Sequence, residues 1–253
     1  MDIDELIECR ILKRISRFTV IVEINNVEVQ VYLGNSGRLL QFMKPGNIGY
    51  LTKVEGGGRK HSYKLLGVKD GDYAAIVDTK IHEDVFAVLI DRDLLPWLQG
   101  FRISRRYPRV DGKILDYLLI GRGSYVLVEI KSAVLRLPSD IAGYPDAPTS
   151  RGRQHLKLLA DKATKHGYEP LVVFICALPN IKKFQLYCEE DREIGAIARY
   201  AQEKGVKFKA IGIYLDPYRK KIVLENPDIP VELECYKHQD LDYDLNNIKS
   251  LIC

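Results

Sequence analysis

The chain has 253 residues, 46% hydrophobic and 28% charged, a composition typical of a globular protein with one large or two modest cores. A net charge of +4 permits a polyanionic partner without requiring one. No apolar run approaches the roughly 20 residues of a membrane-spanning helix, which argues against an α-helical membrane protein. The N-terminus, MDIDELIE, is acidic and lacks the apolar core of a signal peptide, so we expect a cytoplasmic protein.

The five cysteines are widely spaced, at positions 9, 176, 188, 235 and 253. No CxxC pair or Cys/His cluster indicates a zinc site. Their odd number and spacing do not indicate a disulfide framework, and we expect none.

Residues 1–70 predict a small antiparallel barrel. Five short β-rich runs between residues 8 and 69 are separated by turn residues such as Pro45-Gly46, which favours the OB-fold. Such barrels bind single-stranded nucleic acid through cationic grooves and stacking rings. The residues available for such contacts are basic ones at turns and edges, among them Arg14, Arg17 and Lys60, and the aromatic residues Tyr32, Phe42, Tyr50 and Tyr63.

An α/β domain is expected over residues 71–235, after a turn and hinge at residues 70–72. A strand over 73–77 precedes a helix capped by Thr79 and ending near Leu89. The basic stretch of residues 101–113 follows, in which Arg105 and Arg106 would supply counter-charge to a phosphate backbone.

The stretch from Gly112 to Ser132 predicts a β-hairpin, because two apolar runs flank a Gly-Arg-Gly-Ser turn. Side chains alternate along a strand, so Glu129 and Lys131 project from one face, about 7 Å apart. A turn centred on residues 122–123 places Asp116 opposite Glu129, where Cβ atoms are about 5 Å apart. Two carboxylates at that distance repel each other and need a compensating charge.

A divalent cation would supply that charge, since Mg²⁺ prefers carboxylate, water and phosphate oxygens. Lys131 would then orient or deprotonate the attacking water beside a scissile phosphate. This D…(D/E)-x-K arrangement resembles the PD-(D/E)XK nuclease superfamily. The alternative interpretation is that Lys131 only neutralises two carboxylates at a sheet edge.

A proline-containing loop over 137–149 leads into a helix over about 150–166, stopped by Gly167. Arg151, Arg153 and His155 cluster in its first turn. Cations there oppose the helix dipole, so a bound anion explains them better than a structural role does. Strands over 170–178, 206–215 and 220–224 and a helix over 189–204 complete a mixed sheet, and the tail over 236–253 receives no assignment.

Taken together, these segments resemble the sugar fermentation stimulation protein A (SfsA) family over about residues 8–234. The resemblance rests on RISRF at 14–18, GNSGRL at 34–39, RKHSYKL at 59–65, LDYLL at 115–119, VEIKS at 128–132 and YPDAPTSRGRQHL at 144–156. It implies an OB-fold domain followed by a PD-(D/E)XK nuclease-like domain, in a family regarded as DNA-binding, with some members regarded as nucleases.

By that resemblance, Asp116, Glu129 and Lys131 form the catalytic triad. Asp116, Glu129 and the carbonyl of Ile130 hold Mg²⁺ or Mn²⁺. Asn35, Thr149, Arg151 and His155 join the nucleic-acid contacts through the matching motifs. The chain departs from the family pattern at three places: an arginine is replaced by Ile114, an acid by Ser150, and a helical glutamate falls at Ala87–Val88.

Two functions remain open. The first is a Mg²⁺-dependent phosphodiesterase acting on DNA or, as a variant of the same chemistry, on RNA. The second is a non-catalytic DNA-binding regulator of sugar catabolism, which the family name suggests. The complete D…E-x-K pattern favours the enzyme, and the missing arginine and glutamate favour the regulator. The sequence does not indicate an oligomeric state.

Overall fold

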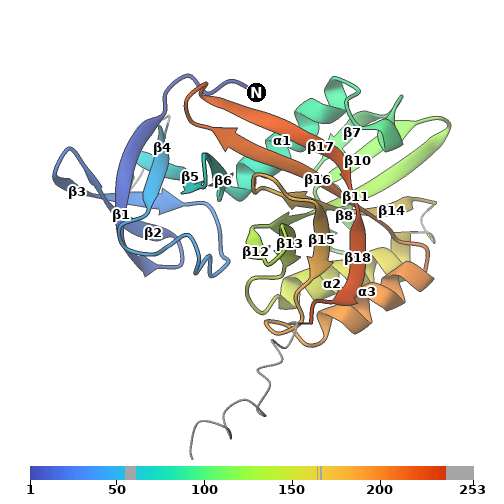
Figure 1. Cartoon of the computed structure of the whole chain (residues 1–253). Helices are drawn as coiled ribbons and strands as arrows, with labels where there is room; N and C mark the ends of the chain where they lie inside the picture. Colours follow the sequence, from blue (N-terminus) through green and yellow to red (C-terminus); the bar gives the residue numbers. More distant parts are fainter. Residues whose placement is uncertain (55–60, 164, 166, 238–253) are drawn as a thin grey trace, which may run out of the picture.

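In the computed structural model, residues 1–54, 61–163, 165 and 167–237 are described here. The first five strands form a closed, mainly antiparallel barrel (Figure 1), which confirms the expected OB-like fold. They are β1 (Ile7–Ser16), β2 (Thr19–Ile24), β3 (Val27–Leu33), β4 (Ile48–Lys53) and β5 (Tyr63–Asp70). A short parallel pairing of β3 with β5, at Tyr32–Lys64 and Leu33–Leu65, closes the barrel.

The core of the barrel contains two of the aromatic residues that the sequence offered for stacking on bases. Inward positions alternate along the strands, and the apolar side chains there, such as Val20, Val22 and Val31, are fully buried. Phe42 and Tyr50 belong to this core, with exposed fractions of 5% and 6%. Neither ring is therefore available for stacking on a base.

The second part of the chain is built on a mixed sheet that continues directly from the barrel. Beyond β5 the strand order is β6 (Tyr73–Ile76), β16 (Lys207–Asp216), β14 (Glu169–Cys176), β11 (Ser124–Ala133), β10 (Tyr117–Gly121) and β7 (Arg102–Arg106), with β17 (Lys221–Ile229) also paired to β16. The hinge expected at residues 70–72 is a tight turn, because Asp70 and Tyr73 pair across it.

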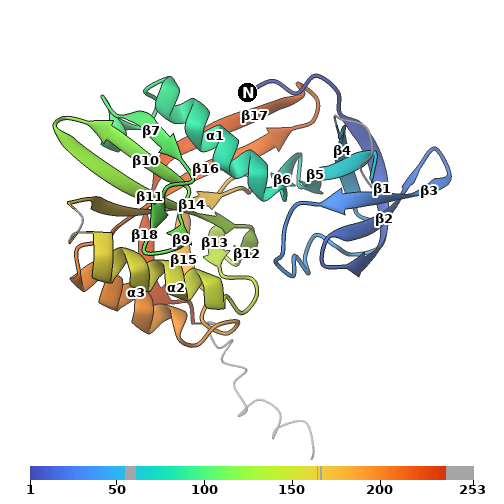
Figure 2. The ribbon, with the colours of Figure 1, turned by 180° about the vertical axis from the view of Figure 1, so that it is seen from behind.

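Helices lie on both faces of this sheet (Figures 1 and 2). Helix α1 (Thr79–Asp91) covers one face, while α2 (Ser150–Leu158) and α3 (Ile194–Glu203) pack together on the other. Short helical segments η1 (Pro96–Leu98) and η2 (Leu159–Ala163) follow α1 and α2. The cap of α1 is Asp78 rather than Thr79: its carboxylate accepts a hydrogen bond from the backbone N–H of Lys80.

A smaller four-stranded sheet lies beside α2 and α3. It contains β12 (Leu135–Leu137), β13 (Ile141–Tyr144), β15 (Lys183–Leu186) and β18 (Val231–Cys235), and the two-residue strands β8 (Arg109–Val110) and β9 (Lys113–Ile114) form a separate hairpin. The expected loop over 137–149 therefore contains a strand, and β15 and β18 were not expected. These strands are short, and their patterns do not separate them from loop.

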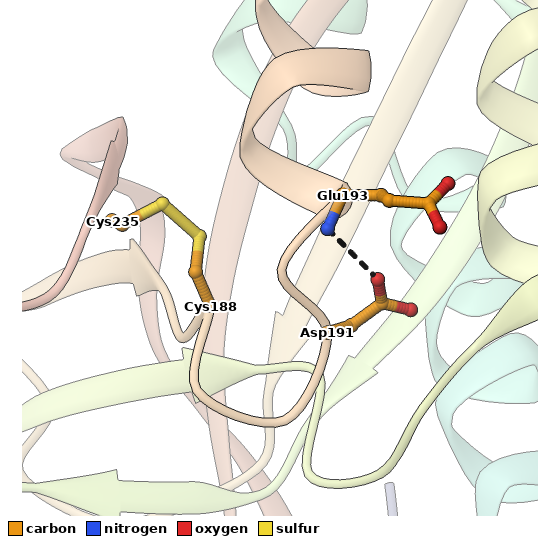
Figure 3. The surroundings of a disulfide bond; sticks show 4 residues. All are labelled: Cys188, Asp191, Glu193 and Cys235. Carbon is orange, nitrogen blue, oxygen red and sulfur yellow. Dashed lines mark hydrogen bonds between the residues drawn. A yellow bond between two sulfur atoms is a disulfide. The ribbon is translucent and has the colours of Figure 1, made fainter.

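The expectation of no disulfide is wrong. Cys188 and Cys235 are joined by a disulfide that links the segment after β15 to the end of β18 (Figure 3). A Cβ atom at Gly195 of α3 would lie 2.7 Å from the sulfur of Cys235, so this glycine lets the helix approach the bond. Cysteines 47 residues apart without a local motif give no sign of pairing, which only the fold reveals. The other cysteines of the described residues, Cys9 and Cys176, are buried thiols.

No helix in the described part of the chain is both long and apolar enough to cross a membrane.

Candidate active site

The hairpin of β10 and β11 has the expected register. Tyr117 pairs with Val128, which places Asp116, the residue before β10, opposite Glu129. A carboxylate oxygen of Asp116, Oδ2, accepts a hydrogen bond of 2.6 Å from the backbone N–H of Ile130. The two acids predicted to form the site are thus held by adjacent strands. Figure 2 shows the end of β11 between α1 and α2.

Glu129 is the centre of the polar contacts. The ammonium group of Lys131 donates to Oε1 of Glu129, and Nδ1 of His155, from α2, lies 2.6 Å from the same oxygen. All three residues are buried, with exposed fractions of 4%, 8% and 4% for Glu129, Lys131 and His155. The structure therefore brings the three triad residues together and adds His155 as a direct partner of Glu129.

Burial and charge act in opposite directions on these groups. Burial is the largest effect on Glu129 and Lys131 and opposes both charges. Their mutual attraction and the hydrogen bonds and charges around them, His155 among them, together exceed it, so the pKa of Glu129 is lowered and that of Lys131 is raised. Burial, followed by the Glu129 charge, raises the pKa of Asp116 to about 7. The site therefore contains an ion pair beside a carboxyl group that readily takes a proton.

The donor atoms provide a partial fit to a hard divalent cation. The second oxygen of Glu129, Oε2, is buried and has no hydrogen-bond partner among the described residues. Asp116 and the Ile130 carbonyl supply further oxygens, the type of donor that Mg²⁺ prefers. No group of three or more His, Cys, Asp or Glu side chains in the described part of the chain is arranged to hold a metal ion by itself, so substrate and water oxygens would have to complete the shell.

A third acid lies close enough to influence the site. The charge of Glu83, on α1, also raises the pKa of Asp116. Its carboxylate accepts a hydrogen bond of 2.8 Å from the hydroxyl of Tyr107. The family pattern places an acid at Ala87–Val88, one turn later on the helix, and Ala87 is buried. Helix α1 thus carries an acid whose charge acts on Asp116, at a position that the motif did not indicate.

A cavity of about 460 Å³ opens beside His155. Residues of the β8–β9 hairpin line one side, including Lys113 and Ile114, and the first turns of α2 line the other, including Arg151. Lys113 donates a hydrogen bond of 2.9 Å to Gln154, which joins the two sides. Arg151 is exposed and has no ion-pair partner among the described residues.

The start of α2 is held by Asp191, a buried residue that the sequence analysis did not select. Thr149 caps the helix, because its hydroxyl oxygen accepts a hydrogen bond of 3.1 Å from the N–H of Gly152. Asp191 accepts the N–H of Thr149 at 2.9 Å and is ion-paired with Arg153. Arg153 therefore has a structural partner, whereas the sequence favoured a bound anion as the explanation for this cation.

Two barrel residues predicted to contact nucleic acid instead organise the loop after β3. The guanidinium of Arg14 donates to the carbonyls of Gly37, Arg38 and Arg17 at 2.6–2.8 Å. Asn35 is buried and donates to the carbonyl of Val77 at 3.0 Å. Their side chains are committed to the protein.

Of the remaining predicted contacts, Arg17, Arg105 and Arg106 are exposed. Arg106 is 3.5 Å from Asp84 and lies over the Tyr117 ring. Arg105 pairs with Leu118 across β7 and β10. Lys60 lies outside the described residues.

Comparison with known proteins identifies the family. Residues 12–77 match the profile described as SfsA N-terminal OB domain, and residues 80–219 match the one described as Sugar fermentation stimulation protein RE domain. The sugar fermentation stimulation protein homolog of Pyrococcus furiosus is 41% identical over 216 residues, covering 85% of this chain and 92% of that protein. The chain belongs to the SfsA family.

Other SfsA relatives agree. The homolog of Archaeoglobus fulgidus is 38% identical over 232 residues, which are 91% of this chain and 97% of that protein. A solved structure of Pyrococcus furiosus SfsA in complex with Ca²⁺ is 39% identical and superposes with a TM-score of 0.86, covering 92% of this chain and 98% of that one. The SfsA fold thus extends over both the barrel and the mixed sheet.

Proposed function

We propose that this SfsA-family chain is a divalent-metal-dependent phosphodiesterase that acts on DNA. The observation that carries the proposal is the arrangement at the end of the β10–β11 hairpin. Two carboxylates on adjacent strands, Asp116 and Glu129, lie beside the buried ammonium group of Lys131. His155, which contacts Glu129, lines an open cavity. That combination provides acidic ligands, a cation and access for a phosphate.

Asp116, Glu129 and the carbonyl of Ile130 are the groups that would hold Mg²⁺ or Mn²⁺. The Oε2 of Glu129, which is buried and has no partner in the described part of the chain, supports this assignment, because a buried oxygen without a donor is costly. The Ca²⁺ complex of the Pyrococcus furiosus relative is consistent with it, since Ca²⁺ also binds through oxygen ligands. The cation would neutralise the two carboxylates and offset charge on the phosphate.

Lys131 would act on the water that attacks phosphorus. Its ammonium is fixed by Glu129 and excluded from bulk solvent, so it can hold a water molecule in one orientation. His155 fixes Glu129 from the other side, which makes it a positioning residue for the carboxylate. Three groups would therefore bind the metal, and two side chains, Lys131 and His155, would orient the water and the carboxylate.

The nucleic-acid backbone would lie along the cavity beside α2. Arg151 and Lys113 line it, and Arg105 and Arg106 supply further positive charge on β7, which precedes the β8–β9 hairpin in the chain. Exposed cations of this kind bind phosphates and release counterions. RNA offers the same phosphates, so discrimination between DNA and RNA would depend on contacts with the sugar.

A non-catalytic DNA-binding regulator is the second candidate, and one observation favours it. Lys131 and His155 both direct their polar groups to one oxygen of Glu129, which neutralises the acid without a metal. On this view, the hairpin charges only stabilise the fold. Mutation of Lys131 separates the two functions.

The test is cleavage of labelled single- and double-stranded DNA with and without Mg²⁺ or Mn²⁺. We expect hydrolysis that requires the metal and is lost in Lys131→Ala, while DNA binding is retained, because the lysine supplies no ligand oxygen. Lys157→Ala, which changes an exposed lysine of α2, is the matched control. Metal-dependent cleavage that persists at the wild-type rate in Lys131→Ala would falsify the assigned role, and binding without cleavage in the wild type would favour the regulator.

A further inference from the structure

A second cavity, of about 440 Å³, lies away from the candidate active site. Its floor is formed by the first residues of β11, β14 and β16, and its wall by the segment around η1. Cavities of this size accommodate small molecules.

The strand register places this cavity on the opposite face of the sheet from Glu129 and Lys131. Side chains alternate between the two faces of a strand, so Val126 of β11 lies on the opposite face of the sheet from Glu129 and Lys131. Val126 pairs with Glu169, and Leu171 pairs with Lys207, so these lining residues share its face. A ligand bound here would not touch the candidate active site.

The interior of the cavity is apolar and aromatic. Val126, Leu171 and Leu98 are buried at its base, and Trp97 and Phe101 form its wall. The indole N–H of Trp97 donates to the carbonyl of Pro227 at 2.8 Å, which fixes the orientation of the ring. Fixed aromatic walls favour a planar ligand, because flat rings stack with little loss of conformational freedom.

The rim carries an excess of positive charge. Lys207 is paired with Glu169 at 2.9 Å, and Lys209 is paired with Asp228 at 2.9 Å. Arg122, in the turn between β10 and β11, lies over the ring of Phe101 and has no ion pair or hydrogen bond to a carboxylate among the described residues. Among the described residues that line the cavity, its guanidinium is the one cation whose charge is not balanced by an acid.

We propose that this cavity binds a small molecule with a planar ring system and one anionic group. The ring would lie between Trp97 and the apolar base, and the anion would meet the guanidinium of Arg122 at the rim. Carboxylate, sulfonate and phosphate groups all match the fork of donors on arginine. The proposal concerns a site separate from the D…E-x-K residues and does not depend on their activity.

The chain contains a single tryptophan, Trp97, so the tryptophan fluorescence of the protein comes from a residue that lines this cavity. The probe is 1-anilinonaphthalene-8-sulfonate, and its matched control is N-phenyl-1-naphthylamine, which has the same rings without the sulfonate. We expect the sulfonate probe to bind the full-length wild-type protein with energy transfer from Trp97. Arg122→Gln should weaken that binding about tenfold and change binding of the neutral probe less than twofold.

Arg192→Gln, which changes an exposed arginine next to α3, should leave both affinities unchanged. Equal loss of both probes in Arg122→Gln, or sulfonate binding without energy transfer from Trp97, would overturn the proposal. Displacement of the probe by a DNA duplex, with the same dependence on Arg122, would also overturn it, because the occupant would then be the polymer. Displacement by AMP would identify a nucleotide as the source of the anion, and displacement by benzoate would identify an aromatic acid.

Discussion

Glu129 is the residue on which the stability of the candidate site depends most directly. It is buried and its Oε1 accepts hydrogen bonds from Lys131 and His155. Removal of one partner of a buried ion pair is costly, because the other charge stays in the interior without compensation. The same contacts that could support catalysis therefore also affect folding.

Glu129→Gln is expected to lower the free energy of unfolding by roughly 3–5 kcal/mol, since it leaves the ammonium of Lys131 buried and unpaired. Adding Lys131→Met to Glu129→Gln removes that charge and should restore a large part of the lost free energy of unfolding. Urea denaturation of the two single variants and the double variant measures the coupling. Additive losses in the double variant would show that the two side chains do not depend on each other.

His82 gives a pH dependence that is separate from the candidate site. It is fully buried in α1, its Nε2 lies 3.0 Å from the carbonyl of Ile76, and burial lowers its pKa to about 4. The folded state therefore resists protonation of a group that takes up a proton near pH 6.5 when unfolded. The stability contributed by neutral His82 is complete above that pH and is lost as the pH falls toward 4.

We expect wild-type stability to decrease by roughly 3 kcal/mol between pH 6.5 and 4, relative to His82→Asn. The comparison uses the slope against pH, so a constant loss of stability in the variant does not affect it. Parallel curves for the two proteins would contradict a buried neutral histidine.

At the scale of elements, helix α2 joins the disulfide to the candidate site. The segment between Cys188 and α3 contains Asp191, whose carboxylate accepts a hydrogen bond from the N–H of Glu193 (Figure 3). The same carboxylate group accepts the N–H of Thr149. Thr149 begins α2, and His155 follows on the same helix. The position of His155 therefore depends on a segment that is itself tied to β18.

Reduction of the disulfide is expected to destabilise the protein by about 3–4 kcal/mol, because the bond closes a long loop in the unfolded chain. Thermal unfolding with and without dithiothreitol measures the effect, and the Cys188→Ser, Cys235→Ser double variant should match the reduced protein. Reductant should have no effect on that variant. An unchanged melting temperature on reduction of the wild type would contradict the expectation.

The elements also show where sequence patterns were sufficient. The β10–β11 hairpin was predictable with its register, because a four-residue turn between two apolar runs allows little choice. The contacts of Arg153 were not predictable, because Asp191 is 38 residues away and approaches only when the chain folds. The same applies to Glu83: a helix places it near Asp116, whereas the motif pointed one turn further.

At the scale of the whole molecule, the barrel and the mixed sheet are joined by strands and by loops. The loop after β3 meets the second part of the chain where the N–H of Leu39 donates to Asp146 at 3.1 Å. Gln41 and Arg136 exchange two hydrogen bonds, of 2.7 and 2.9 Å. Arg14 holds this loop in shape, so a cation that looked available for DNA has a structural role.

We therefore expect Arg14→Ala to lower stability by roughly 2–3 kcal/mol, the order expected for charged hydrogen bonds to carbonyls, and to leave the salt dependence of DNA affinity unchanged. Arg17→Ala is the matched control, because Arg17 is exposed and its side chain has no protein partner among the described residues. If the barrel binds the backbone, Arg17→Ala should flatten the plot of log affinity against log salt by about one unit. A flatter plot for Arg14→Ala at unchanged stability would reverse these assignments.

The segments before and after the barrel both contact the mixed sheet. Met1 and Ile222 exchange backbone hydrogen bonds of 2.8 Å, and β5 continues into β6, which reaches β16 at the pairing of Ala74 with Leu215. The barrel is therefore attached to the mixed sheet at two places and does not depend on one linker about which it could rotate. A polymer that contacts both the barrel and the hairpin site must match a fixed span, and any bending has to come from the polymer.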